Sequence, residues 1–405
     1  MKTVSTTPDT AGTQREILGI VVGFFLLSTA AAAYEIAPAS VFPAIQESLG
    51  LSSSAAGWLV SIMYATAVVT SVPIGVVLDR FSVRRVVGLA TVALVVAGGW
   101  GWYAATAGAF GWLLVSRVLG GLAYVTFWNA GANVVGSAVP PEQRATAVGV
   151  FTASAPVGFA LGQFGSPLIA NAAGWPAILP LYAAIAVVGV VFFALATRRR
   201  VPGVDAPAPD RAALSELFAS RAVWTVCALC FLAYSLYLFV NTWLPSFLAS
   251  EFEISLAASG LLTALFPAIG AVARASSGVI TDRVFGGRRR RVIVSSFAVA
   301  TPAIVAFAFV SGLDAVVVGV VVVGFAIQLV IGLIFSYIAE LVAPSVRTTA
   351  VSILTSVGLL GAFAAPIAGG AIIDYAGYEP AFFAAGGVAV VGVLLALRAP
   401  EPSRV

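Results

Sequence analysis

The sequence predicts an all-α membrane protein whose twelve transmembrane helices form two parallel repeats of six helices each. Apolar residues make up 60% of the 405 residues and charged residues 9%, against roughly 45–50% and about 25% in soluble domains. Apolar runs of spanning length recur along the chain, and landmarks of its first half return in the second half. A soluble core could not enclose so much apolar surface, so most of it must face lipid.

The composition excludes several classes of function. The chain has no histidine, which removes His-based catalytic triads and His metal sites. Cys227 and Cys230 lie inside an apolar run, where we expect small buried residues rather than a redox or metal pair. We therefore expect no enzyme, no cofactor and no metal. The arginine runs are expected to lie near anionic lipid headgroups, with no nucleic-acid partner.

Twelve apolar runs are long enough to cross a bilayer, which requires about 20 residues each. They cover 16–38, 55–79, 84–106, 109–135, 143–171, 176–197, 222–249, 256–281, 291–311, 314–341, 346–373 and 380–398. Lys2 and Arg15 precede the first run, and Ala31-Ala32-Ala33 resembles a signal-peptide cleavage site. We nevertheless expect a retained helix, because the repeat described next requires this span.

Parts of the first half return in the second half at an offset of 203 residues. Gly75, Asp79 and Arg80 return as Gly278, Asp282 and Arg283. Further pairs at this offset are Gly57 with Gly260, Tyr34 with Tyr237, Gly121 with Gly324, Arg144 with Arg347, and Gly158 with Gly361. The predicted organisation is a cytoplasmic tail at 1–15, six-helix bundles at 16–197 and 221–398, a Pro-rich cytoplasmic linker at 198–220, and a cytoplasmic tail at 399–405.

The basic residues indicate the orientation of the spans. If both termini are cytoplasmic, the inner loops and tails hold 19 of the 21 basic residues, in agreement with the positive-inside rule. The outer side carries acidic residues instead, namely Glu47, Glu251, Glu253, Asp314 and Glu379. We expect a multi-pass protein of the cell membrane and, since no helix face argues for an oligomer, a monomer.

The twelve spans, the repeat and two motifs resemble the major facilitator superfamily, and the resemblance covers essentially the whole chain. Between the second and third spans the chain reads Gly75-x-x-x-Asp79-Arg80-x-Ser82-x-Arg84-Arg85, with serine where the family usually has glycine. The fourth span contains Arg117-Val-Leu-Gly-Gly121, which is similar to a second family motif. The resemblance implies a secondary transporter that works by alternating access, with spans one, four, seven and ten around a central cavity.

The resemblance also implies a gate at the cytoplasmic mouth. Asp79, beside Arg80, would face the start of span eleven near Arg347. Asp282, beside Arg283, would face the start of span five near Arg144. Both contacts would hold the inner mouth shut while the outer mouth is open. The alternative is a set of exposed loop pairs worth about 0–1 kcal/mol.

Three charged residues lie inside spans and away from this gate, and such charges mark functional sites by default. Glu35 and Arg117 lie at similar depth, which predicts an ion pair, either permanent or formed in one conformation. Separation of the pair would favour a protonated Glu35 and so couple transport to protons. The alternatives are a purely structural pair, or a Glu35 that reaches the outer interface.

Arg274 has no acidic residue at its depth, and its repeat counterpart is Ser71. A buried guanidinium without a carboxylate partner predicts an anionic ligand bound in bidentate fashion. The position also resembles the monocarboxylate, oxalate/formate and nitrate/nitrite branches of the family, and Ser71 favours a small carboxylate over nitrate. The alternative is an arginine that binds backbone carbonyls or snorkels inward.

Polar residues on the cavity-type spans are candidates to complete the substrate site, unless they serve only helix packing: Tyr34, Asn129, Asn241 and Gln328. The leading hypothesis is a secondary transporter of a small organic anion, coupled to protons. A drug/proton antiporter is the alternative, since Gly149, Gly158 and Gly162 fit its span-five motif while Gln163 departs from it. A transport-dead membrane sensor is a remote third possibility.

Overall fold

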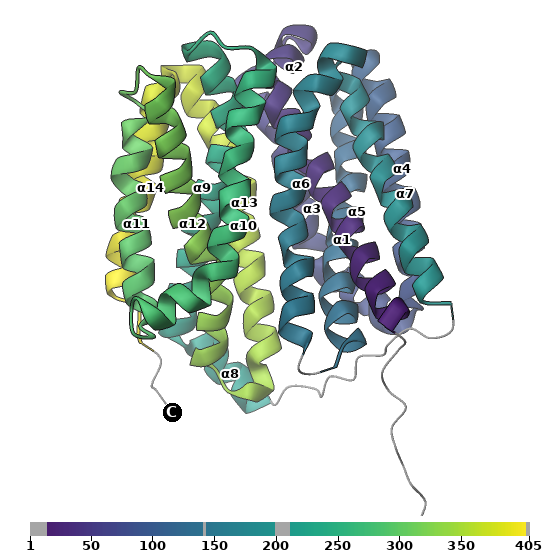
Figure 1. Ribbon diagram of the computed structural model, residues 1–405, viewed down its shortest axis with the longest axis vertical. Coiled ribbons are helices and arrows are strands. Elements are labelled where there is room, and N and C mark those ends of the chain that lie inside the picture. Colours follow the sequence, from purple (N-terminus) through teal and green to yellow (C-terminus); the bar gives the residue numbers. More distant parts are fainter. Residues whose placement is uncertain (1–13, 141–142, 199–210, 402–405) are drawn as a thin grey trace, which may run out of the picture.

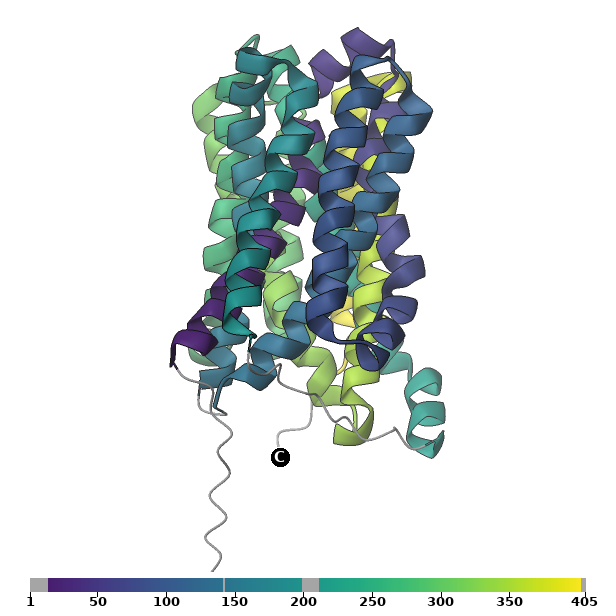
Figure 2. The ribbon, with the colours of Figure 1, turned by 90° about the vertical axis from the view of Figure 1, so that its right-hand side faces the viewer.

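The computed structural model describes residues 14–140, 143–198 and 211–401. Within these ranges every regular element is helical, and the long helices run along one axis (Figures 1 and 2). The first half contains α1 (Gln14–Ile36), α3 (Ser53–Arg80), α4 (Val83–Thr106), α5 (Phe110–Ala138), α6 (Arg144–Ala173) and α7 (Ile178–Ala196). The second half contains α9 (Arg221–Glu251), α10 (Leu256–Arg283), α11 (Arg289–Ala306), α12 (Leu313–Leu341), α13 (Arg347–Ala376) and α14 (Tyr378–Leu397).

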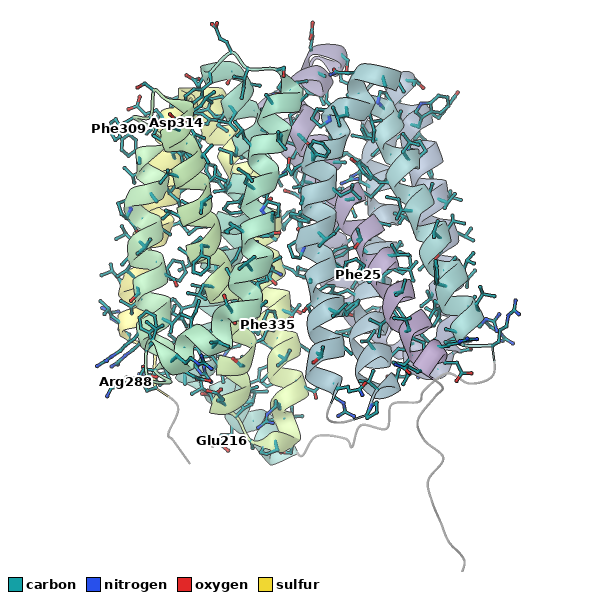
Figure 3. All side chains as sticks on the ribbon, in the orientation of Figure 1. Phe25, Glu216, Arg288, Phe309, Asp314 and Phe335 are labelled. Atoms are coloured by element: carbon teal, nitrogen blue, oxygen red, sulfur yellow. The ribbon has the colours of Figure 1, made fainter. Side chains whose placement is uncertain are left out.

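A helix lies at each of the twelve predicted spans, and the all-α membrane fold predicted from the sequence is confirmed. Eleven spans among the described residues are long and apolar enough to cross a membrane. The exception is α11, because its 18 residues begin with three arginines. Exposed apolar side chains such as Leu89, Leu181 and Val318 cover the sides of the bundle. Charged residues such as Arg288 and Asp314 lie at its two ends (Figure 3).

The two halves repeat each other in three dimensions as they do in sequence. The helix pairs α3 and α10, α5 and α12, and α6 and α13 each begin and end 203 residues apart. Ser52 accepts a hydrogen bond from the backbone N–H of Ala55 at the start of α3, and Ser255 accepts one from that of Ala258 at the start of α10, both at 3.2 Å. Such N-caps satisfy backbone donors that would otherwise lack partners.

The first span differs from its repeat counterpart. Helix α1 ends at Ile36, a 3₁₀ turn covers Ala37–Val41 (η1), and a short helix follows over Phe42–Leu49 (α2). Pro38 causes this break, because it has no N–H to donate to the carbonyl of Tyr34. Helix α9 continues without a break to Glu251. The first span is therefore longer than predicted, and the carbonyl of Tyr34 in its middle lacks the usual backbone donor four residues later.

The predicted linker and tails lie largely outside the described residues. Within 198–220, where the sequence predicted a Pro-rich linker, the described part contains a short helix, α8 (Arg211–Ala219). The two cysteines are free and buried in α9.

The halves meet closely at one end of the bundle. We call the end where α3 finishes at Arg80 and α11 starts at Arg289 the basic end, and the end where α3 begins and α13 finishes the closed end. At the closed end a Cβ atom on Gly57 would lie 2.6 Å from the carbonyl oxygen of Pro366, and one on Gly370 would lie 2.6 Å from that of Ser53. These glycines let α3 and α13 come into backbone contact.

A tryptophan at the closed end also joins the two halves. Trp243 is fully buried, packs on Phe42 at 5.3 Å between ring centroids, and donates a hydrogen bond to the carbonyl of Pro366 at 3.1 Å. Although Trp243 lies near the end of its span, where tryptophans often form an interfacial aromatic belt, its burial excludes that role. Trp102 and Trp112, by contrast, are exposed as such a belt requires.

Candidate functional site

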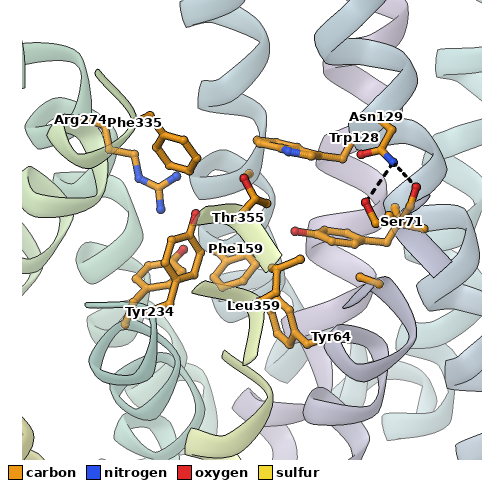
Figure 4. A pocket seen from close by; sticks show the side chains of 15 residues that line it. Tyr64, Ser71, Trp128, Asn129, Phe159, Tyr234, Arg274, Phe335, Thr355 and Leu359 are labelled. Carbon is orange, nitrogen blue, oxygen red and sulfur yellow. Dashed lines mark hydrogen bonds between the residues drawn. The ribbon is translucent and has the colours of Figure 1, made fainter. Parts of the chain in front are cut away.

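A cavity of about 60 Å³ lies between the two halves (Figure 4). Its walls come from α3, α5 and α6 of the first half and from α9, α10, α12 and α13 of the second. A second space of about 600 Å³ shares Trp128, Tyr234 and Arg274 with it and continues to Gly149 and Val351, near the starts of α6 and α13. The cavity is therefore continuous toward the basic end, and the larger of the two connected spaces has the volume of a site for a small organic molecule.

Arg274 extends into this cavity from α10 (Figure 4). Its Nε donates a hydrogen bond to Gln328 Oε1 at 2.5 Å, and its Cζ lies 5.4 Å from the ring centroid of Tyr237. No described carboxylate lies within 4.0 Å of this guanidinium. An arginine has five N–H donors, and no described residue accepts a hydrogen bond from either terminal nitrogen. The terminal N–H groups can therefore bind an anion.

Two glycines bring Gln328 and Arg274 together. A Cβ atom on Gly270, one turn before Arg274, would overlap the side chain of Gln328. A Cβ atom on Gly332, one turn after Gln328, would lie 2.8 Å from the Cα of Arg274. Helices α10 and α12 can therefore approach closely, and the buried Gln328 holds the guanidinium while lying outside the cavity wall.

Arg117 is surrounded differently. It is fully buried on α5 and donates three hydrogen bonds to backbone carbonyls, those of Leu59 at 2.7 Å, Tyr34 at 2.8 Å and Glu35 at 2.6 Å. Tyr34 also places its ring 4.5 Å below the Cζ of Arg117. The guanidinium thus caps the broken end of α1 and ties it to α3, and neither Arg117 nor Tyr34 lines the cavity.

The predicted ion pair between Glu35 and Arg117 is not formed in this conformation. The Glu35 carboxylate is buried and accepts a hydrogen bond from the Tyr64 hydroxyl. Its second oxygen, Oε2, has no hydrogen-bond partner among the described residues. Because Tyr64 is itself part of the cavity wall, this one side chain connects the buried carboxylate to the cavity.

The other predicted polar residues fall into two groups. Asn129 lines the cavity and donates to Ser71, to its carbonyl at 3.2 Å and its hydroxyl at 3.3 Å. Asn241 is buried away from the cavity wall and donates to the carbonyl of Tyr237 at 2.8 Å. The backbone carbonyl of Asn241 accepts a hydrogen bond from Gln163 at 2.6 Å, so Asn241 lies at a contact between the two halves.

The aromatic residues of the wall were missed as a group. Tyr64, Tyr124, Trp128, Tyr234 and Phe335 all line the cavity. Tyr124 and Trp128 lie four residues apart and share one face of α5, which is the only sequence signal that could have grouped them. The same spacing is typical of ordinary helix packing, so it does not by itself distinguish a cavity wall.

The predicted gate residues lie exposed at the basic end. Asp282 pairs with Arg289 at 3.6 Å, and Asp79 has no ion pair with any described residue. Arg144 and Arg347 instead make matching contacts within their own halves, to the carbonyls of Gly136 at 2.8 Å and Ala339 at 3.0 Å. The expected contacts of Asp79 with Arg347 and of Asp282 with Arg144 are thus absent in a conformation that is closed at the other end.

Comparison with known proteins agrees with this architecture. A family profile described as Major Facilitator Superfamily matches residues 20–342 and 287–405. The hexuronate transporter of Bacillus subtilis strain 168 is 25% identical over 387 residues, which cover 89% of each chain. A probable L-galactonate transporter of Escherichia coli K12 is 24% identical over 60% of this chain and 56% of its own. The nitrite extrusion protein of B. subtilis is 25% identical over 39% of this chain and 42% of its own.

Solved structures show the same fold. A bacterial homologue of the human lysosomal transporter Spinster superposes with a TM-score of 0.81 at 18% identity, over 96% of this chain and 98% of that chain. The nucleoside transporter NupG superposes with a TM-score of 0.78 at 15% identity, over 95% and 99% of the two chains.

Proposed function

The chain belongs to the major facilitator superfamily, and from that premise we propose that this transporter moves a small organic anion by alternating access, coupled to protons. The single observation that carries the anion proposal is the Arg274 guanidinium. It lies in a cavity within the spanning region and has no described carboxylate partner. Since a charge there costs at least about 2.5–3.5 kcal/mol, a function for it is expected. The names of three relatives, which concern hexuronate, galactonate and nitrite, support an anion.

The anion proposal is tested by uptake into proteoliposomes, measured against protein-free vesicles. Arg274→Gln is expected to abolish uptake of the anion that the wild-type protein transports, while the protein stays folded, because the side chain reaches into a cavity. The matched control is Arg291→Gln, since Arg291 is exposed at the basic end and outside the cavity. Full uptake by Arg274→Gln would overturn the anion site.

Contacts at the closed end support alternating access. Asp374 of α13 accepts hydrogen bonds from the backbone N–H groups of Ser53 at 2.6 Å and Ser54 at 2.8 Å. These are free donors at the start of α3, in the other half, where the helix dipole favours a carboxylate. We propose that the opposite conformation breaks these bonds and forms the pairs of Asp79 with Arg347 and of Asp282 with Arg144.

The arrangement of charges supports an orientation. The basic end carries Arg80, Arg283 and Arg288, which by the positive-inside rule faces the cytoplasm. In this proposal both termini are cytoplasmic in the cell membrane, and the cavity is continuous toward the cytoplasm.

Glu35 is the proposed proton-coupling residue. It is buried, one of its oxygens lacks a described partner, and the Tyr64 hydroxyl links it to the cavity. A substrate that displaces Tyr64 would leave the carboxylate without its donor, which favours binding of a proton. The arrangement allows occupancy of the cavity to change the protonation of Glu35 without direct contact.

Replacement of Glu35 by glutamine tests this coupling. Glu35→Gln is expected to abolish substrate-driven acidification of the vesicle lumen and to retain exchange of labelled for unlabelled substrate, because exchange moves no protons. The control is Glu379→Gln, at the start of α14 and outside the cavity. Acidification at the wild-type rate in Glu35→Gln would contradict the role of Glu35.

The drug/proton antiporter is the second candidate, and the aromatic cavity wall favours it. Flat aromatic faces attract lipophilic cations, whereas the Arg274 guanidinium in the same wall repels them. The uptake assay separates the two functions, since drug antiport would alkalinise the lumen as protons leave in exchange for the cation.

A further inference from the structure

Aromatic side chains dominate the wall around Arg274. Seven of the 15 residues that line the cavity are aromatic. They come from both halves, with Tyr64, Trp128 and Phe159 on one side and Tyr234 and Phe335 on the other. Trp128 and Phe335 belong to both connected spaces, so a molecule between the basic end and Arg274 passes along their rings (Figure 4).

A stack of rings underlies Arg274 and crosses the interface between the halves. Phe159 of α6 stacks on Tyr237 of α9 with 5.4 Å between centroids and 15° between planes. Tyr237 stacks in turn on Phe266 of α10 at 5.9 Å and 24°. Because aromatic pairs gain stability beyond the area they bury, this stack is a firm support for the guanidinium at the interface.

The wall carries a single charge. Arg274 is its only charged residue, and no acidic residue is among the 15. The other arginine within a spanning helix, Arg117, has its guanidinium on three carbonyls and lies outside the wall. A second negative charge on the substrate would be buried without a partner, which is costly. The cavity therefore suits a monoanion.

Several polar groups of the wall already have hydrogen-bond partners within the protein. Asn129 donates to Ser71, Tyr64 donates to Glu35, and the Thr355 hydroxyl donates to the carbonyl of Val351 at 2.8 Å. A polyhydroxylated acid would bring several hydroxyl groups, each of which needs a partner once it leaves water. The groups of the wall that make no hydrogen bond to a described residue, among them Trp128 Nε1 and the hydroxyls of Tyr124 and Tyr234, stand on aromatic rings. The wall therefore offers more ring surface than hydrogen-bond partners, and a sugar acid fits it less well than an aromatic acid.

We propose that the substrate class is the aromatic monocarboxylates, with the carboxylate bound to the terminal nitrogens of Arg274 and the ring held among Trp128, Tyr234 and Phe335. This inference rests on the proposed function as an anion transporter and narrows it. It separates the chain from the relatives whose names concern sugar acids.

Calorimetric binding to the purified full-length protein in detergent tests the inference with five ligands that differ in one property each. Benzoate is expected to bind. Cyclohexanecarboxylate keeps the charge and the ring size but loses the aromatic face, and it is expected to bind roughly two- to tenfold more weakly. Phthalate adds a second charge, benzyl alcohol removes the charge, and glucuronate replaces the ring face with hydroxyls. These three are expected to show no binding.

Variants of the wall sharpen the test. Trp128→Leu is expected to lower benzoate affinity severalfold and to remove the preference over cyclohexanecarboxylate, while Trp128→Phe keeps that preference. The control is Trp112→Leu, because Trp112 is exposed and outside the cavity. Equal affinity of the wild-type protein for benzoate and cyclohexanecarboxylate would overturn the aromatic part of the inference.

The remaining outcomes separate this inference from the proposed function. Binding of glucuronate but not benzoate, lost in Arg274→Gln, would overturn the aromatic substrate and leave the anion transporter standing. Binding of phthalate as tight as that of benzoate would overturn the inference that the substrate is a monoanion. Binding of tetraphenylphosphonium with no binding of any anion would overturn both proposals.

Discussion

Arg117 in the first half and Arg274 in the second both lie within spanning helices, yet their hydrogen-bond donors end in different places. Arg117 is enclosed and donates to three backbone carbonyls. Arg274 is half-buried, donates to Gln328 and points its terminal nitrogens into a cavity. Both lie over a tyrosine ring, at 4.5 Å and 5.4 Å. Of these two arginines, only Arg274 keeps N–H donors with which to bind a ligand.

The repeat makes the contrast sharper. At an offset of 203 residues, the counterpart of Arg117 is Val320 and that of Arg274 is Ser71. Neither charge is required by the repeated helices themselves. Arg117 compensates for Pro38, which has no N–H to donate to the carbonyl of Tyr34; the Arg117 guanidinium supplies that hydrogen bond instead. Arg274 supplies no such hydrogen bond to a backbone carbonyl, since its guanidinium donates only to Gln328 among the described residues.

The largest effect is expected from removal of the enclosed arginine. Arg117→Leu leaves the carbonyls of Tyr34, Glu35 and Leu59 buried without this donor, and each such group costs about 1–3 kcal/mol. We expect little folded protein, with a large drop in thermal midpoint and in monodisperse yield. Arg291→Leu at the surface is the control and is expected to change stability by about 0.5 kcal/mol or less. A normally stable Arg117→Leu that has lost transport would reverse the assignment.

A smaller, purely functional effect is expected from the residue that holds the second arginine. Gln328→Glu places a carboxylate beside the Arg274 guanidinium, where a charge-assisted bond competes with any anion. Anion affinity is expected to fall about tenfold or more, seen as a higher KM in uptake with little change in kcat. Gln328→Leu only removes the Nε partner, so its loss of affinity is expected to be about threefold. If Gln328→Glu binds the anion as well as the wild-type protein does, Gln328 does not position Arg274.

Most of the fold could be predicted from the sequence, because hydropathy and the repeat are properties of residue type. Both intramembrane arginines were found in the same way. Their difference could not be predicted, since the partners of Arg117 are backbone carbonyls, which every residue has. One signal was available in the sequence. Pro38 lies four residues after Tyr34 and has no N–H, which predicts that the carbonyl of Tyr34 lacks a helical donor. The cavity wall was missed because Tyr124 and Trp128 show a spacing that packing also produces.

The smallest effects are expected from replacement of the two tyrosines whose rings lie beneath the arginines. A ring face beside a guanidinium contributes about 0.5–1 kcal/mol, and about 2 kcal/mol when desolvated. Tyr34→Leu is expected to lower the thermal midpoint and to leave anion affinity nearly unchanged, because its arginine is structural. Tyr237→Leu is expected to weaken anion binding about two- to fivefold, because its ring steadies a guanidinium that faces the cavity. Calorimetry and thermal unfolding of both variants measure the two effects side by side. If the roles exchange, so that Tyr34→Leu weakens binding and Tyr237→Leu does not, Arg117 is the arginine that senses the substrate.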